Sequence, residues 1–181
     1  MPLSKKLLKL LDKEKIKHEI LKHKKIYTAF DAAQTLREDV SKVAKSLLVK
    51  VDKKPVVVVV PAHYRVDLKK LKKLLKATSV EIVKETQIKK ILKEAPGVLT
   101  AFGSVHHMDV VLDRALLKAE KVIFNAGSFT ESLRLRMKDY VKVEHPKTGT
   151  VAAKVSGLGK QKRAPAKKAK KIKNTQIKKR A

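Results

Sequence analysis

The run VAKSLLVKVDKKPVVVVVP at residues 43–61 predicts two strands joined by a short turn. No position in VVVVVP (56–61) is polar, so this strand offers no face to water. Such a strand is expected at the centre of a sheet, with both of its faces buried. VAKSLLVKVD (43–52) is expected to form a second strand, and KKP (53–55) the turn between the two. Pro61 ends the strand VVVVVP.

Lys45 occupies an unusual place in this run. Because side chains alternate between the faces of a strand, Lys45 falls on the apolar face with Leu47 and Val49, whereas Lys50 falls on the other. A lysine in such a place either extends its ammonium to water from the sheet edge or serves a binding pocket. The pattern alone leaves both readings open.

Helices and strands are expected to alternate on either side of this run. Leucine spacing and capping residues predict helices at 3–11, 28–36, 67–76, 86–94, 114–120 and 138–144. Apolar or alternating stretches predict further strands at 17–21, 80–83, 109–113, 121–127 and 132–137. The fold class is therefore α/β (α+β), with a mixed central β-sheet of about five to seven strands and flanking helices. Regular structure is expected to end near residue 150.

The composition excludes several classes of protein. With 43% apolar residues among 181, the chain can build one domain with a real core. It contains no cysteine, which excludes disulfides, thiolate zinc sites and a cysteine nucleophile. No signal peptide and no apolar run of about 20 residues is present, so we expect a cytoplasmic protein without membrane contact.

The net charge of +28 points to a polyanionic partner, above all a nucleic acid. Residues 154–181 contain 12 Lys or Arg and no acid, whereas the rest of the chain has 33 against 17 acids. We therefore expect a folded domain at 1–150 and a Lys-rich, disordered, nucleic-acid-binding tail at 151–181. Aromatic residues make up only 4%, and no aromatic platform of the RNA-binding type is visible.

The common catalytic signatures are absent. No P-loop, dinucleotide-binding glycine motif or nucleophile elbow occurs. His106 and His107 are adjacent and Asp109 is near, but neighbouring side chains point apart, which makes a poor metal site. We expect no metal and no cofactor.

Four stretches, taken in order, carry a resemblance to a known family. They are YTAFDAA (27–33), VAKSLLVKVD (43–52), APGVLTAFG (95–103) and VVLDRALLKAEKVIFNAGS (110–128). Together they resemble the YbaK / prolyl-tRNA synthetase-associated editing-domain family, over about residues 3–143. The resemblance implies a free-standing enzyme of translation fidelity that hydrolyses the ester of a mischarged aminoacyl-tRNA.

The resemblance also implies the site residues. Lys45 matches a family lysine that faces the pocket, and it would hold the RNA end. Gly97, Val98 and Gly103 are expected to act with it, because amides of a glycine-bearing loop can stabilise an oxyanion. Further substrate contacts are expected from a helix cap, the rest of the loop, a strand end and a turn: Thr28, Leu99, Thr100, Ala101, Phe102, Asp113, Ala126, Gly127 and Ser128.

Several of these residues have a second reading or depart from the family pattern. Asp113 would either orient the substrate ammonium or cap the helix that follows it. Thr28 and Asp31 have the spacing of a capping box. Ala101 stands where many members have proline, and Phe129 stands where some have histidine. Both departures bear on substrate choice and rate.

The implied reaction is metal-free. Water or the free ribose hydroxyl would attack the ester, and a small pocket would admit Ala, Ser or Cys. The partner is tRNA, with an aminoacyl-tRNA synthetase as a further candidate. Two alternatives remain at this stage: a non-catalytic tRNA/RNA-binding module on the same fold, and a basic ribosome- or nucleoid-associated protein.

Overall fold

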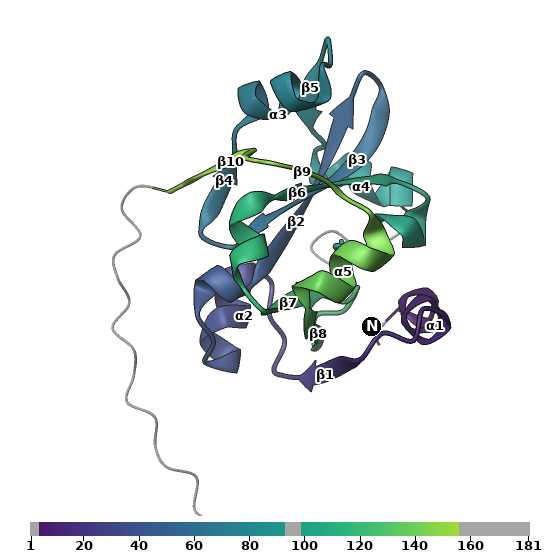
Figure 1. The fold of residues 1–181 in the computed structure, drawn as a ribbon, viewed down its shortest axis with the longest axis vertical. Coiled ribbons are helices and arrows are strands. Elements are labelled where there is room, and N and C mark those ends of the chain that lie inside the picture. Colours follow the sequence, from purple (N-terminus) through teal and green to yellow (C-terminus); the bar gives the residue numbers. More distant parts are fainter. Residues whose placement is uncertain (1–3, 93–98, 156–181) are drawn as a thin grey trace, which may run out of the picture.

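A computed structural model of the chain describes residues 4–92 and 99–155 (Figure 1). The helices are α1 (Lys5–Lys13), α2 (Ala29–Leu36), α3 (Leu68–Leu75), α4 (Glu85–Leu92) and α5 (Met137–Glu144), with the 3-10 turns η1 (Val40–Lys42), η2 (Gly103–His106) and η3 (Arg114–Lys118). The strands are β1 (His18–Lys22), β2 (Ala44–Val51), β3 (Lys54–Pro61), β4 (Tyr64–Val66), β5 (Val80–Ile82), β6 (Asp109–Asp113), β7 (Lys121–Asn125), β8 (Glu131–Arg136), β9 (Lys147–Gly149) and β10 (Ala152–Lys154).

The central sheet confirms the prediction made from the apolar strand. Its order is β5-β2-β3-β6-β9, so β3 lies in the middle. β3 pairs antiparallel with β2 and parallel with β6, which makes the sheet mixed. Val57, Val58, Val59 and Val60 of β3 have no exposed surface, as a strand without a polar face requires.

The turn between β2 and β3 begins one residue earlier than expected. Asp52 and Lys53 form it, both with positive φ (45° and 73°), while Lys54 already belongs to β3. Positive φ at two central residues matches the right-handed twist of a hairpin, although glycine and asparagine usually fill these places. The Asp52 carboxylate accepts hydrogen bonds from the N–H groups of Thr78 (2.9 Å) and Ser79 (2.7 Å), which holds the turn.

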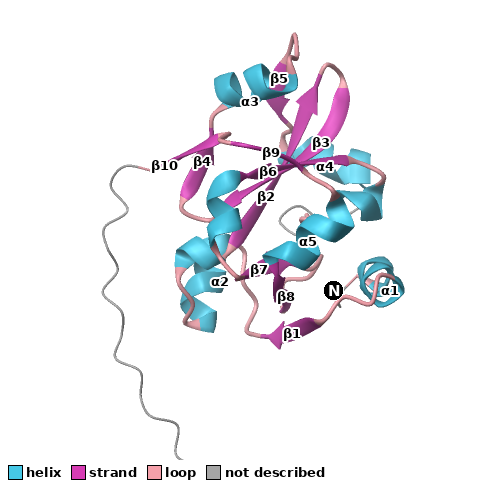
Figure 2. Ribbon diagram, viewed as in Figure 1, coloured by secondary structure: helices cyan, strands magenta, loops and turns pink. Residues whose placement is uncertain are grey.

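Each face of the central sheet is covered by its own core, and Figure 2 shows the helices arranged around the strands. One face carries Leu48, Val57 and Leu112 and packs against α1 and an aromatic trio. The opposite face carries Val49, Val58 and Val111, and packs against α3. The trio consists of Phe102, Phe124 and Tyr140, all fully buried.

A second, antiparallel sheet of order β1-β8-β7 lies beside the first. A bridge between Val43 and Ile123 connects it to the start of β2. After β1 the chain continues alongside the β7–β8 turn, because the His23 and Ile26 N–H groups donate to the carbonyls of Thr130 and Phe129, both at 2.9 Å. This pairing leads the chain to the capping box that begins α2.

Side chains cap three of the helices, and the capping box predicted at Thr28 and Asp31 is confirmed. The Ser4 hydroxyl accepts from the Leu7 N–H at the start of α1, and Asp67 accepts from two N–H groups at the start of α3. Thr28 and Asp31 form the reciprocal capping box of α2. No helix in the described parts of the chain is long and apolar enough to cross a membrane.

Three short strands differ from the expectation: β4, β9 and β10. β9 pairs with β6 and β10 pairs with β4, so regular structure continues beyond residue 150 to Lys154. Strands of three residues carry too little periodicity to be seen in a sequence. The Asp113 carboxylate fixes this region, because it accepts from the Val151 (2.8 Å) and Ala152 (2.9 Å) N–H groups.

We expect Asp113→Ala to lower the free energy of unfolding by at least about 2 kcal/mol, because it leaves buried N–H groups without an acceptor. Asp67→Ala removes an ordinary helix cap and is the matched control, with an expected loss of about 1 kcal/mol. Urea denaturation of both variants measures the difference. Equal losses would contradict a special role for the buried carboxylate.

We expect Gly103→Ala to destabilise the protein by about 1–3 kcal/mol, because it overpacks the core. A Cβ there would lie 2.5 Å from the Met108 carbonyl oxygen, which is backbone and cannot rotate away. Gly149→Ala is the control, since its Cβ would meet only the Leu74 side chain, at 2.6 Å. Thermal unfolding should show the larger loss for Gly103→Ala, and the reverse order would refute the argument.

Candidate functional site

The loop at Leu99–Gly103 and the turn at 125–128 lie together in the structure. The Thr100 hydroxyl donates to the Asn125 carbonyl oxygen at 3.2 Å, and the Tyr140 hydroxyl donates to the Ala101 carbonyl oxygen at 2.7 Å. Leu99, Thr100, Ala101 and Phe102 are all buried. The structure therefore brings together two of the four stretches that carry the family resemblance.

The turn itself is held by its own hydrogen bonds. Gly127 adopts a positive φ of 78°, a conformation that glycine reaches without strain, and its N–H donates to Asn125 Oδ1 at 2.7 Å. The Ser128 hydroxyl accepts from the Thr130 N–H at 3.1 Å, and the Ala126 carbonyl accepts from the Ser4 N–H at 3.2 Å. The backbone of the turn is thus preorganised.

Ser104, the residue after Gly103, is held by a side chain of α5. The Glu144 carboxylate accepts from the Ser104 N–H at 3.1 Å and from the Ser104 hydroxyl. Burial raises the pKa of Glu144, and these hydrogen bonds oppose the rise. The end of the loop is therefore joined to α5, a contact that no local sequence pattern predicts. Gly97 and Val98 lie outside the described residues.

The Lys45 ammonium is half-buried and points to backbone oxygens. It donates to the carbonyl oxygens of Tyr64 (2.8 Å) and Ala62 (3.5 Å). Burial lowers its pKa, and the positive charge of Arg65 lowers it further. In the register of β2, Lys45 lies opposite Val60, on the face covered by α3.

Ser46, the next residue, points to the opposite face. It lies opposite Val59, whose side chain belongs to the core that also contains Ala101 and Ala126. The Ser46 hydroxyl oxygen is buried and has no hydrogen-bond partner within the described residues. The structure thus separates Lys45 from the loop across the sheet and adds Ser46, which the sequence analysis missed, to the loop's side.

The surroundings of Lys45 are basic. Arg65 and Lys154 belong to the paired strands β4 and β10, and both are exposed. Burial lowers the pKa of His63, and the charge of Lys154 lowers it further. This basic corner of β2, β4 and β10 suits an anionic ligand.

Asp113 and Thr28 act as caps in the structure. Asp113 is 1% exposed, and its Oδ1 accepts from the Ala115 N–H at 2.8 Å, which is the capping alternative of the sequence analysis. Thr28 caps α2. Neither side chain shares a hydrogen bond with the loop in the part of the chain that the structure describes.

Two surface hollows, of about 300 and 520 Å³, lie apart from the predicted site residues. The first is lined by Glu38, Lys42, Glu120, Lys121, Ile123 and Arg134. The second is lined by Leu117, Ala119, Glu120, Arg136, Met137, Lys138 and Val141. No group of three or more His, Asp or Glu side chains that could hold a metal ion occurs at residues 4–92 or 99–155.

Comparison with solved structures supports the fold. A crystal structure of a candidate trans-editing enzyme for prolyl tRNA synthetase superposes with a TM-score of 0.72. The match covers 84% of this chain and 99% of that one, at 20% sequence identity.

Two curated relatives are similar in sequence. The prolyl-tRNA editing protein ProX of Acetoanaerobium sticklandii is 24% identical over 139 residues, which are 74% of this chain and 85% of that protein. The proline–tRNA ligase of Macrococcus caseolyticus is 30% identical over 91 residues, or 50% of this chain. The chain spans only 16% of that ligase.

The family comparison covers most of the described domain. Residues 23–143 match the aminoacyl-tRNA editing domain, about two thirds of the chain. The matched region contains the capped helix α2, the strands β2 and β3, the loop at 99–103 and the turn at 125–128. The match confirms the resemblance seen in the four motifs. The chain therefore belongs to the aminoacyl-tRNA editing domain family.

Proposed function

We propose that this protein is a deacylase that acts in trans and hydrolyses the ester bond of a mischarged aminoacyl-tRNA. The observation that carries the proposal is the buried contact between the loop and the turn, the Thr100 hydroxyl on the Asn125 carbonyl, within a domain of this family. A rigid backbone of this kind can place N–H groups against a developing oxyanion without reorganisation.

The proposed mechanism uses positioning rather than a side-chain nucleophile. An aminoacyl ester is already activated, so water or the free ribose hydroxyl needs only to be held against its carbonyl. We assign the oxyanion donors to the amides of Gly97 and Val98, which the family resemblance indicates. Gly103 acts indirectly, because its missing side chain lets the loop pass Met108.

We assign Lys45 to the RNA end. Two backbone carbonyls hold its ammonium, which leaves donor capacity for a phosphate oxygen. Arg65 and Lys154 add positive charge at the same corner. Lys45 therefore positions the RNA end, while the loop on the other side of β2 contacts the aminoacyl group.

The amino acid is proposed to be small: Ala, Ser or Cys. Support comes from the tight packing of the site, since Thr100, Ala101, Phe102, Ala126 and Ser128 are each at most 2% exposed. Selection would then be by size, since a small pocket excludes a large side chain. We propose the proline tRNA as the acceptor, since the relatives are named for prolyl-tRNA or its synthetase.

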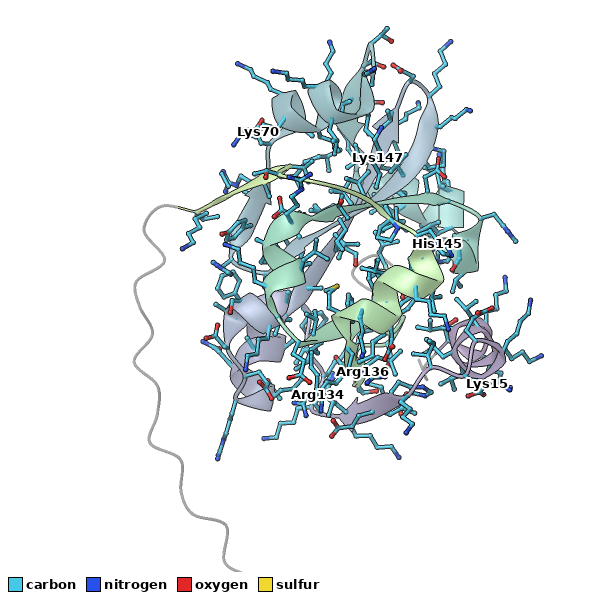
Figure 3. All side chains as sticks on the ribbon, viewed as in Figure 1. Lys15, Lys70, Arg134, Arg136, His145 and Lys147 are labelled. Carbon is cyan, nitrogen blue, oxygen red and sulfur yellow. The ribbon has the colours of Figure 1, made fainter. Side chains whose placement is uncertain are left out.

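The charge distribution supports tRNA as the partner. Figure 3 shows nitrogen-tipped side chains that extend outward around the whole outline of the described domain. Phosphate contacts of this kind provide affinity without reading sequence. We propose that residues 156–181, with 11 Lys or Arg and no acid, add to this binding, and that the protein acts in the cytoplasm, with an aminoacyl-tRNA synthetase as a further partner.

A non-catalytic RNA-binding module is the second candidate. Two observations favour it: Ala101 stands in place of the family proline, and Phe129 stands where some members have histidine. Hydrolysis of a mischarged tRNA separates the deacylase from the non-catalytic module.

We expect the protein to release one small amino acid from a panel of Ala-, Ser-, Cys- and Pro-charged proline tRNA. Lys45→Ala should lower kcat/KM at least about tenfold, which is 1.4 kcal/mol of transition-state stabilisation. Lys50→Ala is the matched control, because Lys50 lies on the same strand but is exposed and pairs with Glu81 at 3.8 Å. Release of radiolabelled amino acid measures kcat/KM for the unsubstituted protein, Lys45→Ala and Lys50→Ala.

Turnover of none of the four substrates, together with tight RNA binding, would favour the non-catalytic module. Equal activity in Lys45→Ala and Lys50→Ala would refute the positioning role of Lys45 but leave the deacylase proposal intact.

Deletion of residues 156–181 should weaken tRNA binding at low salt and flatten the slope of log Kd against log salt. Turnover of bound substrate should change little, because β10 ends at Lys154 and the described domain stays whole. Filter binding at several salt concentrations and single-turnover hydrolysis provide the two measurements. An unchanged salt slope would show that these cations do not contact RNA.

A further inference from the structure

An aromatic pair lies at the surface of the domain. The rings of Tyr27 and Phe129 have centroids 5.5 Å apart and are tilted by 54°. Tyr27 precedes α2 and Phe129 lies between β7 and β8, elements that Figure 1 shows in the same region of the fold. The sequence analysis expected no aromatic platform and overlooked this pair, because its members are far apart in the chain.

The core does not account for the Tyr27 ring. Tyr27 is 64% exposed, whereas Phe102, Phe124 and Tyr140 are fully buried. A large exposed aromatic side chain costs hydrophobic free energy that burial would recover. Residues of this kind on a protein with a strong positive charge often serve as stacking surfaces for bases.

The pair is preorganised by the backbone. The Ile26 N–H donates to the Phe129 carbonyl at 2.9 Å, one residue before Tyr27. On its other side, Tyr27 adjoins the capping box of Thr28 and Asp31. Both rings therefore start from fixed backbone positions, which reduces the entropy lost when a ligand stacks on them.

A cation accompanies the two rings. Lys25 Nζ lies 5.1 Å from the Tyr27 centroid and 5.6 Å from the Phe129 centroid, within the range of cation–π attraction. An exposed lysine next to an aromatic surface is suited to a nucleotide, which presents a flat base and an anionic phosphate together.

The pair also adjoins the proposed site. Phe129 follows Ser128 directly, and Ser128 ends the turn that contacts the loop. In an aminoacyl-tRNA the amino acid is attached to the ribose of the last nucleotide, so that base must lie close to the site that binds the ester. The surface beside the turn is where this base would be placed.

A purely structural role for Tyr27, as part of a hydrophobic staple, explains fewer of these observations than base stacking does. A residue immediately before an N-cap can pack against the fourth helical residue as a hydrophobic staple. Here that residue is Ala32, but the Tyr27 ring contacts Phe129 and stays exposed. A staple would not require the neighbouring cation either.

We propose that Tyr27 and Phe129, with Lys25, form a stacking platform for the terminal base of the tRNA acceptor end. The platform rests on the proposed function, and it adds a nucleobase subsite beside the site for the ester. Stacking selects a flat base at the end of a single strand, whichever amino acid is attached.

The test compares two RNA hairpins that carry a single-stranded CCA end, one intact and one without the terminal base. The full-length protein should bind the intact RNA about 5- to 100-fold more tightly, the range expected for stacking of one base on an aromatic surface. Tyr27→Leu, which keeps an apolar side chain but removes the ring, should bind both RNAs equally. Tyr27→Phe should keep the difference.

A fluorescent readout tests the stacking itself. With 2-aminopurine in place of the terminal adenine, binding to the full-length protein should quench the fluorescence, and binding to Tyr27→Leu should not. Ile82→Ser is the matched control, because Ile82 is 46% exposed on β5, at an edge of the other sheet. This variant should quench as the unsubstituted protein does.

Equal binding of both RNAs by the unsubstituted protein would overturn the platform, even if Tyr27→Leu failed to fold. Discrimination that persists in folded Tyr27→Leu and Phe129→Leu variants would also overturn it. The result is separable from the proposed function: hydrolysis without base discrimination removes only the platform, and base discrimination without hydrolysis supports the platform and removes the deacylase.

Discussion

A strand without a polar face must be covered on both sides, and β3 imposes this constraint on the whole domain. β2 and β6 satisfy its backbone hydrogen bonds, and two separate cores cover its faces. α1 and the aromatic trio pack on one face, and α3 packs on the other. The remaining elements are arranged around this buried sheet.

The same constraint divides the functional residues. Alternation along β2 sends Lys45 to the α3 side and Ser46 to the side of the loop, since neighbouring side chains in a strand point in opposite directions. The proposed deacylase therefore has two parts, a basic corner at β2, β4 and β10 and a rigid loop and turn across the sheet. A substrate that reaches both must be long, as an RNA end with an attached amino acid is.

Two carboxylates stabilise this arrangement, the buried Asp113 and the partly exposed Glu144. Asp113 ties the end of β6 to β10, which positions the strand that carries Lys154. Glu144 ties the end of α5 to the turn after the loop. Each accepts N–H groups that have no backbone acceptor, and each fixes one border of the site. Basic side chains dominate the surface, and these two carboxylates hold segments that are far apart in the sequence.

Local sequence patterns were sufficient to predict much of the fold and to recognise the family. The apolar run of β3, the hairpin with β2 and the capping box at Thr28 and Asp31 depend on residues close together in the chain, whose spacing reflects strand and helix geometry directly. β4, β9 and β10 were not predictable, because three residues carry no periodicity and their pairing partners are remote.

The contacts that define the site depend on remote residues as well. Thr100 with Asn125, Ser104 with Glu144 and Tyr27 with Phe129 each join segments that have no common local pattern. Sequence patterns record the periodicity of single elements, whereas the distance between two elements is set by how their apolar faces pack. The sequence therefore indicated which residues belong to the loop, the turn and the capped helix. Only packing put the loop across the sheet from Lys45, joined Ser104 to Glu144 and brought two distant aromatic rings together.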